Sequence, residues 1–205
     1  MNRLDGAATR GMLIYAAQKI IESKPLLTEI DSKIGDGDHG IGMARGMQNA
    51  KNVLLKMDDC TDPYELFLSL GKAMLTSMGG ASGVIFGTMF MSGAKGKPPV
   101  EALQPPDFAK MMRDSLTAVK ECGKARVGDK TMGDAFDPAV QAMEGHAAGS
   151  MAEMLKSAEE AAAEGAENTK RYQAKFGRAK SLMERAIGFQ DAGATSVWII
   201  FRTLG

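Results

Sequence analysis

Apolar residues recur every three or four positions along most of this chain, which is the spacing of one buried face of an α-helix. The chain has 16 Met residues, whereas aromatic residues make up only 6% of it. A core built on Met, Ala and Leu favours helices over strands. The pattern therefore predicts an all-α protein, with helical stripes at residues 13–21, 43–54, 67–78, 108–119, 136–143 and 151–162.

Proline and capping residues locate the ends of several of these helices. A first helix is expected over residues 8–24, and Pro25 then lies in the first turn of a short helix carrying LLTEIDSKI. Asp62 and Pro63 have the character of an N-cap and a first-turn proline. The Ala-, Glu- and Lys-rich residues 150–175 predict one long amphipathic helix with a charged outer face.

Two segments leave helix and strand open on periodicity alone. Residues 84–91 (VIFGTMFM) favour a helix because their neighbours are helical and aromatic residues are few. The final VWIIFRTL also favours a helix, with a strand as the alternative because of its β-branched residues. The expected architecture is about eight helices, with no convincing strand pair, in a single domain over residues 1–205.

The charge balance gives no sign of a nucleic-acid or membrane partner. Lys and Arg together number 25, as do Asp and Glu, so the formal net charge is zero. No stretch is long and apolar enough to span a bilayer, and Asp5 and Arg10 interrupt the start before a signal peptide forms. Cys60 and Cys122 are isolated, so we expect two free thiols and a reducing, cytoplasmic location.

Glycine-rich segments recur between the predicted helices, at residues 35–42, 79–83, 123–133 and 188–193. In an up-and-down helical arrangement, alternate connections fall at the same end of the bundle. We therefore expect several of these segments to meet in one site.

The segment DSKIGDGDHG (residues 31–40) does not fit two familiar loops, and a second glycine-rich segment does not fit a third. GDGDHG satisfies G-x-G-x-x-G, but a dinucleotide loop needs a preceding strand, which LLTEIDSKI does not provide. An EF-hand fails because Met47 stands where a bidentate Glu is required. The related segment GKARVGDKT (residues 123–131) misses the P-loop because Asp129 separates its glycine from the lysine.

A hard-cation site remains. Asp31, Asp36 and Asp38 offer three carboxylates within eight residues, and Mg²⁺ prefers oxygen ligands while leaving positions for phosphate oxygens. A helix that starts near Gly40, with His39 at the junction, would direct its N–H groups toward the same phosphates. The plain alternative is a solvated Asp- and Gly-rich turn that contains His39.

Three other segments pose the same choice between ligand binding and an ordinary turn. GGASG (residues 79–83) either cradles an anion, with Ser82 as a hydroxyl donor or cap, or simply connects two helices. GDKTMGD and FQDAGATS are equally ambiguous when taken alone.

Four blocks together, in this order, resemble the nucleotide-binding L subunits of the dihydroxyacetone kinase family. They are EIDSKIGDGDHGIGMARG, GGASGVIFGTMF, GKARVGDKTMGDAFDP and FGRAKSLMERAIGFQDAGATS. The resemblance extends from about residue 10 to the C-terminus. It implies a barrel of eight antiparallel helices with a nucleotide and Mg²⁺ at one end.

The resemblance also implies site residues. The metal aspartates of the family fall on Asp31, Asp36 and Asp38. The contacts to ADP or ATP fall on His39, Gly40, Ile41, Gly42, Ala81, Ser82, Gly123, Met132, Arg178, Asp191, Ala192 and Gly193. Arg178 suits a role beside phosphate, although without the resemblance it would be taken for a surface arginine.

The chain departs from the family pattern at three positions. The usual block reads like GHQDPGATS, so Phe189 and Ala192 stand in place of a histidine and a proline. Gly42 stands where an asparagine is common. These changes indicate a divergent member and motivate a tetrose or another carbohydrate as an alternative substrate.

The implied activity is transfer of a phosphoryl group to a small ketose, which a separate K subunit holds through a histidine. This chain has only His39 and His146, so we expect a subunit that needs that partner. The donor stays open: bound ADP is rephosphorylated by a phosphotransferase-system protein in bacterial stand-alone members, which GGASGVIFGTMF resembles more, whereas other members exchange ATP. A further alternative is a nucleotide-loaded module that regulates another protein.

Overall fold

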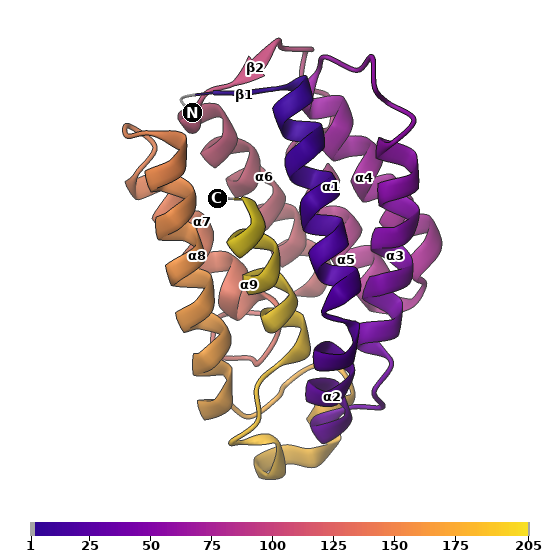
Figure 1. Ribbon diagram of the computed structural model, residues 1–205. Helices are drawn as coiled ribbons and strands as arrows, with labels where there is room; N and C mark the ends of the chain where they lie inside the picture. Colours follow the sequence, from indigo (N-terminus) through magenta and orange to yellow (C-terminus); the bar gives the residue numbers. More distant parts are fainter. Residues whose placement is uncertain (1–2, 205) are drawn as a thin grey trace.

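The computed structural model describes residues 3–204, which form a closed ring of eight long helices (Figure 1). In order around the ring these are α1 (Gly6–Glu22), α3 (His39–Leu54), α4 (Pro63–Met78), α5 (Gly80–Met91), α6 (Pro105–Gly123), α7 (Gly133–Gly145), α8 (Met151–Asn168) and α9 (Ala192–Leu204). Each contacts the next, and α9 contacts α1, which closes the barrel. The expected all-α fold is confirmed.

Neighbouring helices run in opposite directions, so every second connection lies at the same end of the barrel. The short helix α2 (Lys24–Ile34) stands at this end and packs on α3. The same end holds residues 35–38, 79–80, 124–132 and 169–191. We call it the loop end.

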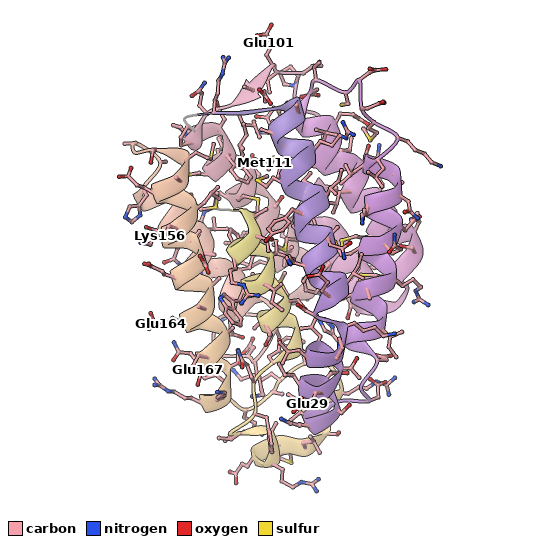
Figure 2. All side chains as sticks on the ribbon, viewed as in Figure 1. Glu29, Glu101, Met111, Lys156, Glu164 and Glu167 are labelled. Atoms are coloured by element: carbon pink, nitrogen blue, oxygen red, sulfur yellow. The ribbon has the colours of Figure 1, made fainter. Side chains whose placement is uncertain are left out.

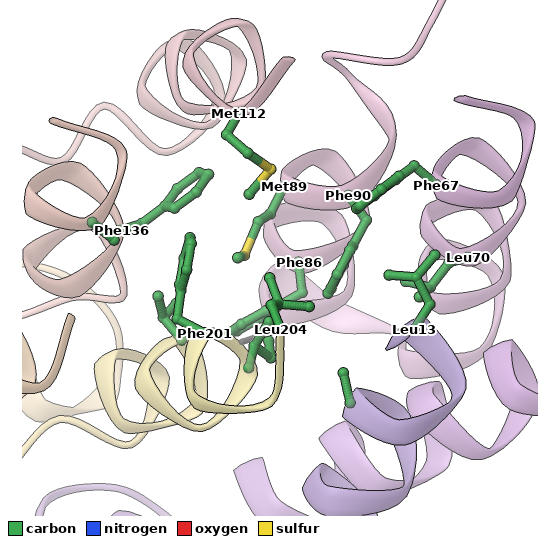
Figure 3. Close-up of a cluster of buried hydrophobic side chains, with 14 of the residues drawn as sticks. Leu13, Phe67, Leu70, Phe86, Met89, Phe90, Met112, Phe136, Phe201 and Leu204 are labelled. Atoms are coloured by element: carbon green, nitrogen blue, oxygen red, sulfur yellow. The ribbon is translucent and has the colours of Figure 1, made fainter. Parts of the chain in front are cut away.

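The interior of the ring is filled by Met, Leu and Phe side chains from all sides (Figure 3). The ring centroids of Phe67 and Phe108 lie 5.6 Å apart, and those of Phe136 and Phe201 lie 6.2 Å apart. Unbranched Met side chains, such as that of Met89, fill the irregular gaps between such rings. A protein with few aromatic residues can therefore still have a well-filled core.

Charged side chains cover the outside of the ring. On α8, Lys156, Glu164 and Glu167 point away from the barrel (Figure 2). This helix begins with a capping box, in which Ser150 and Glu153 each accept the other's backbone N–H. Within residues 3–204, no helix is both long enough and apolar enough to cross a membrane.

Two of the predicted helix starts agree with the structure in detail. Pro25 lies in the first turn of α2, and the Asp62 carboxylate accepts the Tyr64 N–H ahead of α4. The predicted first helix is displaced by two residues from α1. The ambiguous residues 84–91 lie in α5, and VWIIFRTL lies in α9, so both are helical.

The prediction of one helix over residues 150–175 is wrong at its C-terminal end, because α8 stops at Asn168. The buried Thr169 hydroxyl donates to the Ala166 carbonyl at 2.6 Å and accepts the Asp191 N–H at 2.9 Å. The chain therefore turns at Thr169 into the short 3₁₀ helix η1 (Thr169–Arg171).

Two further features were not predicted. Strand β1 (Leu4–Asp5) pairs antiparallel with β2 (Ala102–Leu103), but two residues are too few to show a strand period. The 3₁₀ helix η2 (Arg178–Ala186) was not among the predicted helices either.

Close contact between α8 and the start of α7 depends on Gly165. A Cβ atom added at Gly165 would lie 2.1 Å from the Asp134 carbonyl oxygen. Relief of that clash requires the backbone beside the α6–α7 loop to move. The packing of α8 and the shape of the loop end are thus coupled.

We expect Gly165→Ala to lower the free energy of unfolding by about 1–3 kcal/mol, because the neighbouring group is backbone and cannot rotate away. Gly11→Ala is the matched control, since Gly11 lies in α1 with nothing within 4 Å of an added Cβ. It should raise the stability by about 0.4–1 kcal/mol. Chemical denaturation measures both values, and equal effects would contradict this view of the α7–α8 contact.

Candidate functional site

The α2–α3 turn brings three carboxylates together at the loop end. Asp31 lies in the last turn of α2, and Asp36 and Asp38 lie in the turn that follows. Each offers an oxygen, and these three oxygens all lie within 4.8 Å of one another. The turn is tight at Gly37, whose φ is +76° and whose added Cβ would lie 2.5 Å from Ser32 Oγ.

Mutual repulsion shapes the electrostatics of this carboxylate cluster. Partial desolvation, followed by the Asp36 and Asp31 carboxylates, raises the pKa of Asp38, and Arg178 opposes that rise. Arg178 Nε lies 2.5 Å from Asp36 Oδ2, while its side chain is 72% exposed. Asp38 precedes α3 without capping it through its side chain. Three convergent hard oxygen donors with incomplete charge compensation suit a divalent cation such as Mg²⁺.

His39 connects the start of α3 to α9. Its backbone N–H donates to Asp31 Oδ2 at 3.3 Å, and its Nε2 lies 2.8 Å from Ser196 Oγ. Since the Ser196 hydroxyl donates its hydrogen to the Ala192 carbonyl, its oxygen can accept a hydrogen bond from His39 in the Nε2–H tautomer. Burial lowers the pKa of His39, which favours the neutral ring.

The start of α3 approaches α2 closely. A Cβ added at Gly40 would lie 2.5 Å from the Lys24 carbonyl oxygen. Ile41 and Gly42 follow in the first turn, where Ile41 is half exposed. The first turn of α3 therefore lies directly beside the carboxylate cluster and remains partly accessible.

The α4–α5 turn provides a second exposed helix start. Gly79 and Gly80 have φ values of +71° and +62°, which favour glycine. Ala81 and Ser82 follow as exposed residues in the first turn of α5, and no side chain caps this helix. Exposed first-turn N–H groups form a suitable surface for phosphate oxygens.

Direct contacts join these segments to the rest of the loop end. The His39 and Phe86 rings lie 6.0 Å apart, which links α3 to α5. A Cβ added at Gly123, the last residue of α6, would lie 3.3 Å from Ile85 Cδ1. The structure thus brings α3, α5 and α6 together around the first two glycine-rich segments.

The remaining predicted residues lie at the start of α9. A Cβ added at Gly193 would lie 3.3 Å from Cβ of Met132, so the α6–α7 loop and α9 are adjacent. Asp191 caps α9 by accepting the Ala194 N–H at 2.7 Å, and Ala192 is buried. Desolvation raises the pKa of Asp191 to about 6, opposed by that hydrogen bond.

An open groove of about 1260 Å³ adjoins the carboxylate cluster. It runs between the C-terminal end of α2 and η2, with Asp36 and Arg178 on its lining. Of the predicted site residues, Asp36 and Arg178 line this groove, so it gives access to one side of the carboxylate cluster.

Sequence reasoning missed several residues that organise this end. Asp134 accepts the Gly128 and Thr131 N–H groups at 2.5 and 2.7 Å, which shapes the α6–α7 loop. Lys130 is buried there with a positive φ of 60°. The position of Asp134 just before the apolar stripe at residues 136–143 could have indicated a residue that accepts backbone N–H groups at a helix start. Nothing in the nearby sequence indicates that Lys130 is buried.

The DAK2 domain family model matches residues 33–205. The chain belongs to the DAK2 domain family. One DAK2-related protein is "PEP-dependent dihydroxyacetone kinase, ADP-binding subunit DhaL" of Escherichia coli, with 37% identity over 87% of this chain and 85% of that protein. Another is "PEP-dependent dihydroxyacetone kinase 1, ADP-binding subunit DhaL" of Listeria innocua, with 34% identity over 91% of this chain and 89% of that protein.

Solved structures agree with the DAK2 assignment. The native dihydroxyacetone kinase of C. freundii superposes with a TM-score of 0.75 at 25% identity, covering 97% of this chain and 34% of that one. The same kinase in complex with AMP-PNP and Mg²⁺ superposes equally well. This chain corresponds in fold to about one third of that longer enzyme.

The raised pKa of Asp191 predicts pH-dependent stability. The folded state holds the Asp191 carboxyl proton more tightly than the unfolded chain does. The stability that this contributes is complete below the unfolded pKa, near 4, and is lost as pH rises through about 6. We expect Asp191→Asn, which keeps a cap acceptor, to be about 1–3 kcal/mol more stable than the parent at pH 7.

The difference between the two unfolding free energies should shrink toward pH 4, where both side chains are neutral. Denaturation curves for the two proteins between pH 4 and 8 measure it. A pH-independent difference would show that Asp191 does not carry this penalty.

Proposed function

We propose that this chain is the nucleotide-binding subunit of a dihydroxyacetone kinase and uses ADP or ATP with Mg²⁺ for phosphoryl transfer to a small ketose. The observation that carries the proposal is the meeting of a carboxylate cluster with two glycine-rich helix starts at the loop end, one partly accessible (α3) and one exposed (α5). The relatives of similar length named as ADP-binding subunits of such kinases support it. We also propose that residues 1–205 act as one domain.

Asp31, Asp36 and Asp38 would hold Mg²⁺, since their oxygens converge and their charges are only partly compensated. When bound, the metal would neutralise phosphate charge. His39, Gly40, Ile41 and Gly42 at the start of α3, with Ala81 and Ser82 at the start of α5, would contact the phosphates.

The other proposed contacts come from the opposite side of the loop end. Gly123, Met132, Ala192 and Gly193 would form a small, close-packed wall for the nucleotide, together with Asp191. Arg178 would release its ion pair with Asp36 and stabilise charge on the transferred phosphoryl group, because a guanidinium binds phosphate oxygens in a bidentate manner.

The ketose would be held by a separate K subunit. His39 is bonded to Ser196, and His146 lies at the C-terminal end of α7, away from the loop end, where its Nδ1 contacts the Ala142 carbonyl. His39 lies beside the carboxylate cluster, but its ring is already engaged with Ser196, and His146 lies at the other end of the barrel. A phosphotransferase-system protein would restore the phosphoryl group on bound ADP, as the names of the bacterial relatives suggest.

A tetrose kinase is the second candidate. The "D-erythrulose kinase" of Mycolicibacterium smegmatis is 33% identical, but this chain covers only 33% of it. The relatives of matching length are dihydroxyacetone kinase subunits, which favours the first candidate. No feature of the described residues favours a purely regulatory module.

We expect Asp36→Ala to weaken Mg²⁺-dependent ADP binding by at least about tenfold, which corresponds to 1.4 kcal/mol. Asp59→Ala is the control, because Asp59 is an exposed aspartate in the α3–α4 connection. Calorimetric titration with ADP, in Mg²⁺ and in EDTA, measures both variants. Unchanged Mg²⁺-dependent binding in Asp36→Ala would make the metal assignment wrong.

The nucleotide that remains bound through purification identifies the donor. Denaturing the purified chain should release ADP if a phosphoprotein restores the phosphoryl group in place, because the nucleotide then never needs to leave. Chromatography of the released material is the measurement. A chain that purifies empty and exchanges ATP freely would contradict the phosphoprotein route while leaving nucleotide binding intact.

A further inference from the structure

The segment between α8 and α9 is an excursion with closely joined ends. This arm, residues 169–191, leaves α8 at Thr169 and returns at Asp191, whose N–H donates to Thr169 Oγ1 at 2.9 Å. Next to this bond, the Gly188 N–H donates to the Lys170 carbonyl at 2.7 Å. These two bonds form a neck, from which the rest of the arm extends across the loop end.

Lys130 inserts into this neck from the α6–α7 loop. Its Nζ donates to the Thr169 carbonyl at 2.6 Å and also to the Phe189 carbonyl. The Thr169 carbonyl belongs to the chain segment that leaves α8, and the Phe189 carbonyl belongs to the segment that returns to α9. A single side chain from another part of the sequence therefore holds these two segments together.

The Lys130 side chain is buried, and its charge is compensated by its neighbours. Lys130 is only 2% exposed. Its backbone φ is +60°, which is unusual for any residue other than glycine. Burial lowers the pKa of Lys130, and the Asp191 and Asp134 carboxylates oppose this shift. A buried cation with two carbonyl acceptors and two nearby carboxylates is compensated, so it can remain inside the fold.

The far part of the arm is held by the neck, by packing of Ala174 and Ala186 against Ile34 of α2, and by two polar attachments. Arg178 reaches from the arm to Asp36 in the carboxylate cluster. A second attachment joins Lys175 to Asp129, through a backbone bond of 3.1 Å and an ion pair of 2.6 Å, but the Lys175 side chain is 65% exposed. The Lys175 ammonium of this pair lies at the surface, where water competes for it, whereas the Lys130 ammonium and its two contacts are buried.

We propose that Lys130 is a positioning residue that clips the neck of the arm and thereby sets where Arg178 stands relative to the carboxylate cluster. The clip itself follows from the contacts of the arm. Its effect on nucleotide binding rests on the proposed function.

Lys130→Met tests the clip, because methionine is close in length but donates no hydrogen bond. Hydrogen exchange in nucleotide-free protein should show about tenfold or greater loss of protection at the Gly188 and Asp191 amides, with α4 and α5 unchanged. Lys170→Met is the matched control, since it removes an exposed ammonium from the same neck. Unchanged neck protection in Lys130→Met, or an equal loss in Lys170→Met, would overturn the proposal.

Lysine labelling of the unsubstituted chain gives a second test that holds even if Lys130→Met fails to fold. Reductive methylation should modify Lys130 about tenfold or more slowly than Lys175 and Lys180, which are exposed, because labelling requires the neck to open. Equal labelling rates would show that the neck does not hold Lys130.

The link to the nucleotide site has its own measurement. Lys130→Met should weaken binding of Mg²⁺–ADP relative to Lys170→Met, measured at a temperature at which both nucleotide-free variants are folded. Binding as tight as in the parent would contradict the positioning role. If the parent itself binds no nucleotide, the proposed function fails, whereas the exchange result still decides whether the clip exists.

Discussion

Carboxylate repulsion is the constraint on which the loop end depends. Three oxygens of Asp31, Asp36 and Asp38 lie within 4.8 Å of one another, and only the exposed Arg178 forms an ion pair with the cluster within the described residues. Added positive charge relieves the mutual repulsion of these carboxylates, and a divalent cation supplies it more compactly than one exposed arginine. The carboxylates that would repel a nucleotide alone can attract it through a metal.

The barrel places this cluster among suitable partners because its helices alternate in direction. Every second connection falls at one end, so residues far apart in sequence meet there without a dedicated binding domain. The starts of α3 and α5 supply backbone N–H groups, and the start of α9 supplies small residues. The Met- and Leu-rich core holds these helices rigidly, while the arm remains the least deeply packed part of the site.

Periodic apolar stripes predicted six of the eight ring helices, because each of these buries one face in the same core, whereas periodicity alone left α5 and α9 open between helix and strand. The three aspartates and the glycine-rich segments were also visible, since they lie close in sequence or match family blocks. The end of α8 was not visible in the sequence, because a hydrogen bond from the distant Asp191 N–H to the Thr169 hydroxyl fixes it. Lys130 was missed for the same reason: its burial depends on carbonyls 39 and 59 residues away.

Thermodynamic linkage between metal and nucleotide tests the central claim most directly. If Mg²⁺ bridges the carboxylate cluster and the phosphates, each ligand must tighten binding of the other by the same factor. Calorimetry should therefore give one coupling factor, of about tenfold or more, whether ADP is titrated with and without Mg²⁺ or Mg²⁺ with and without ADP. Equal ADP affinity in Mg²⁺ and in EDTA would contradict the account.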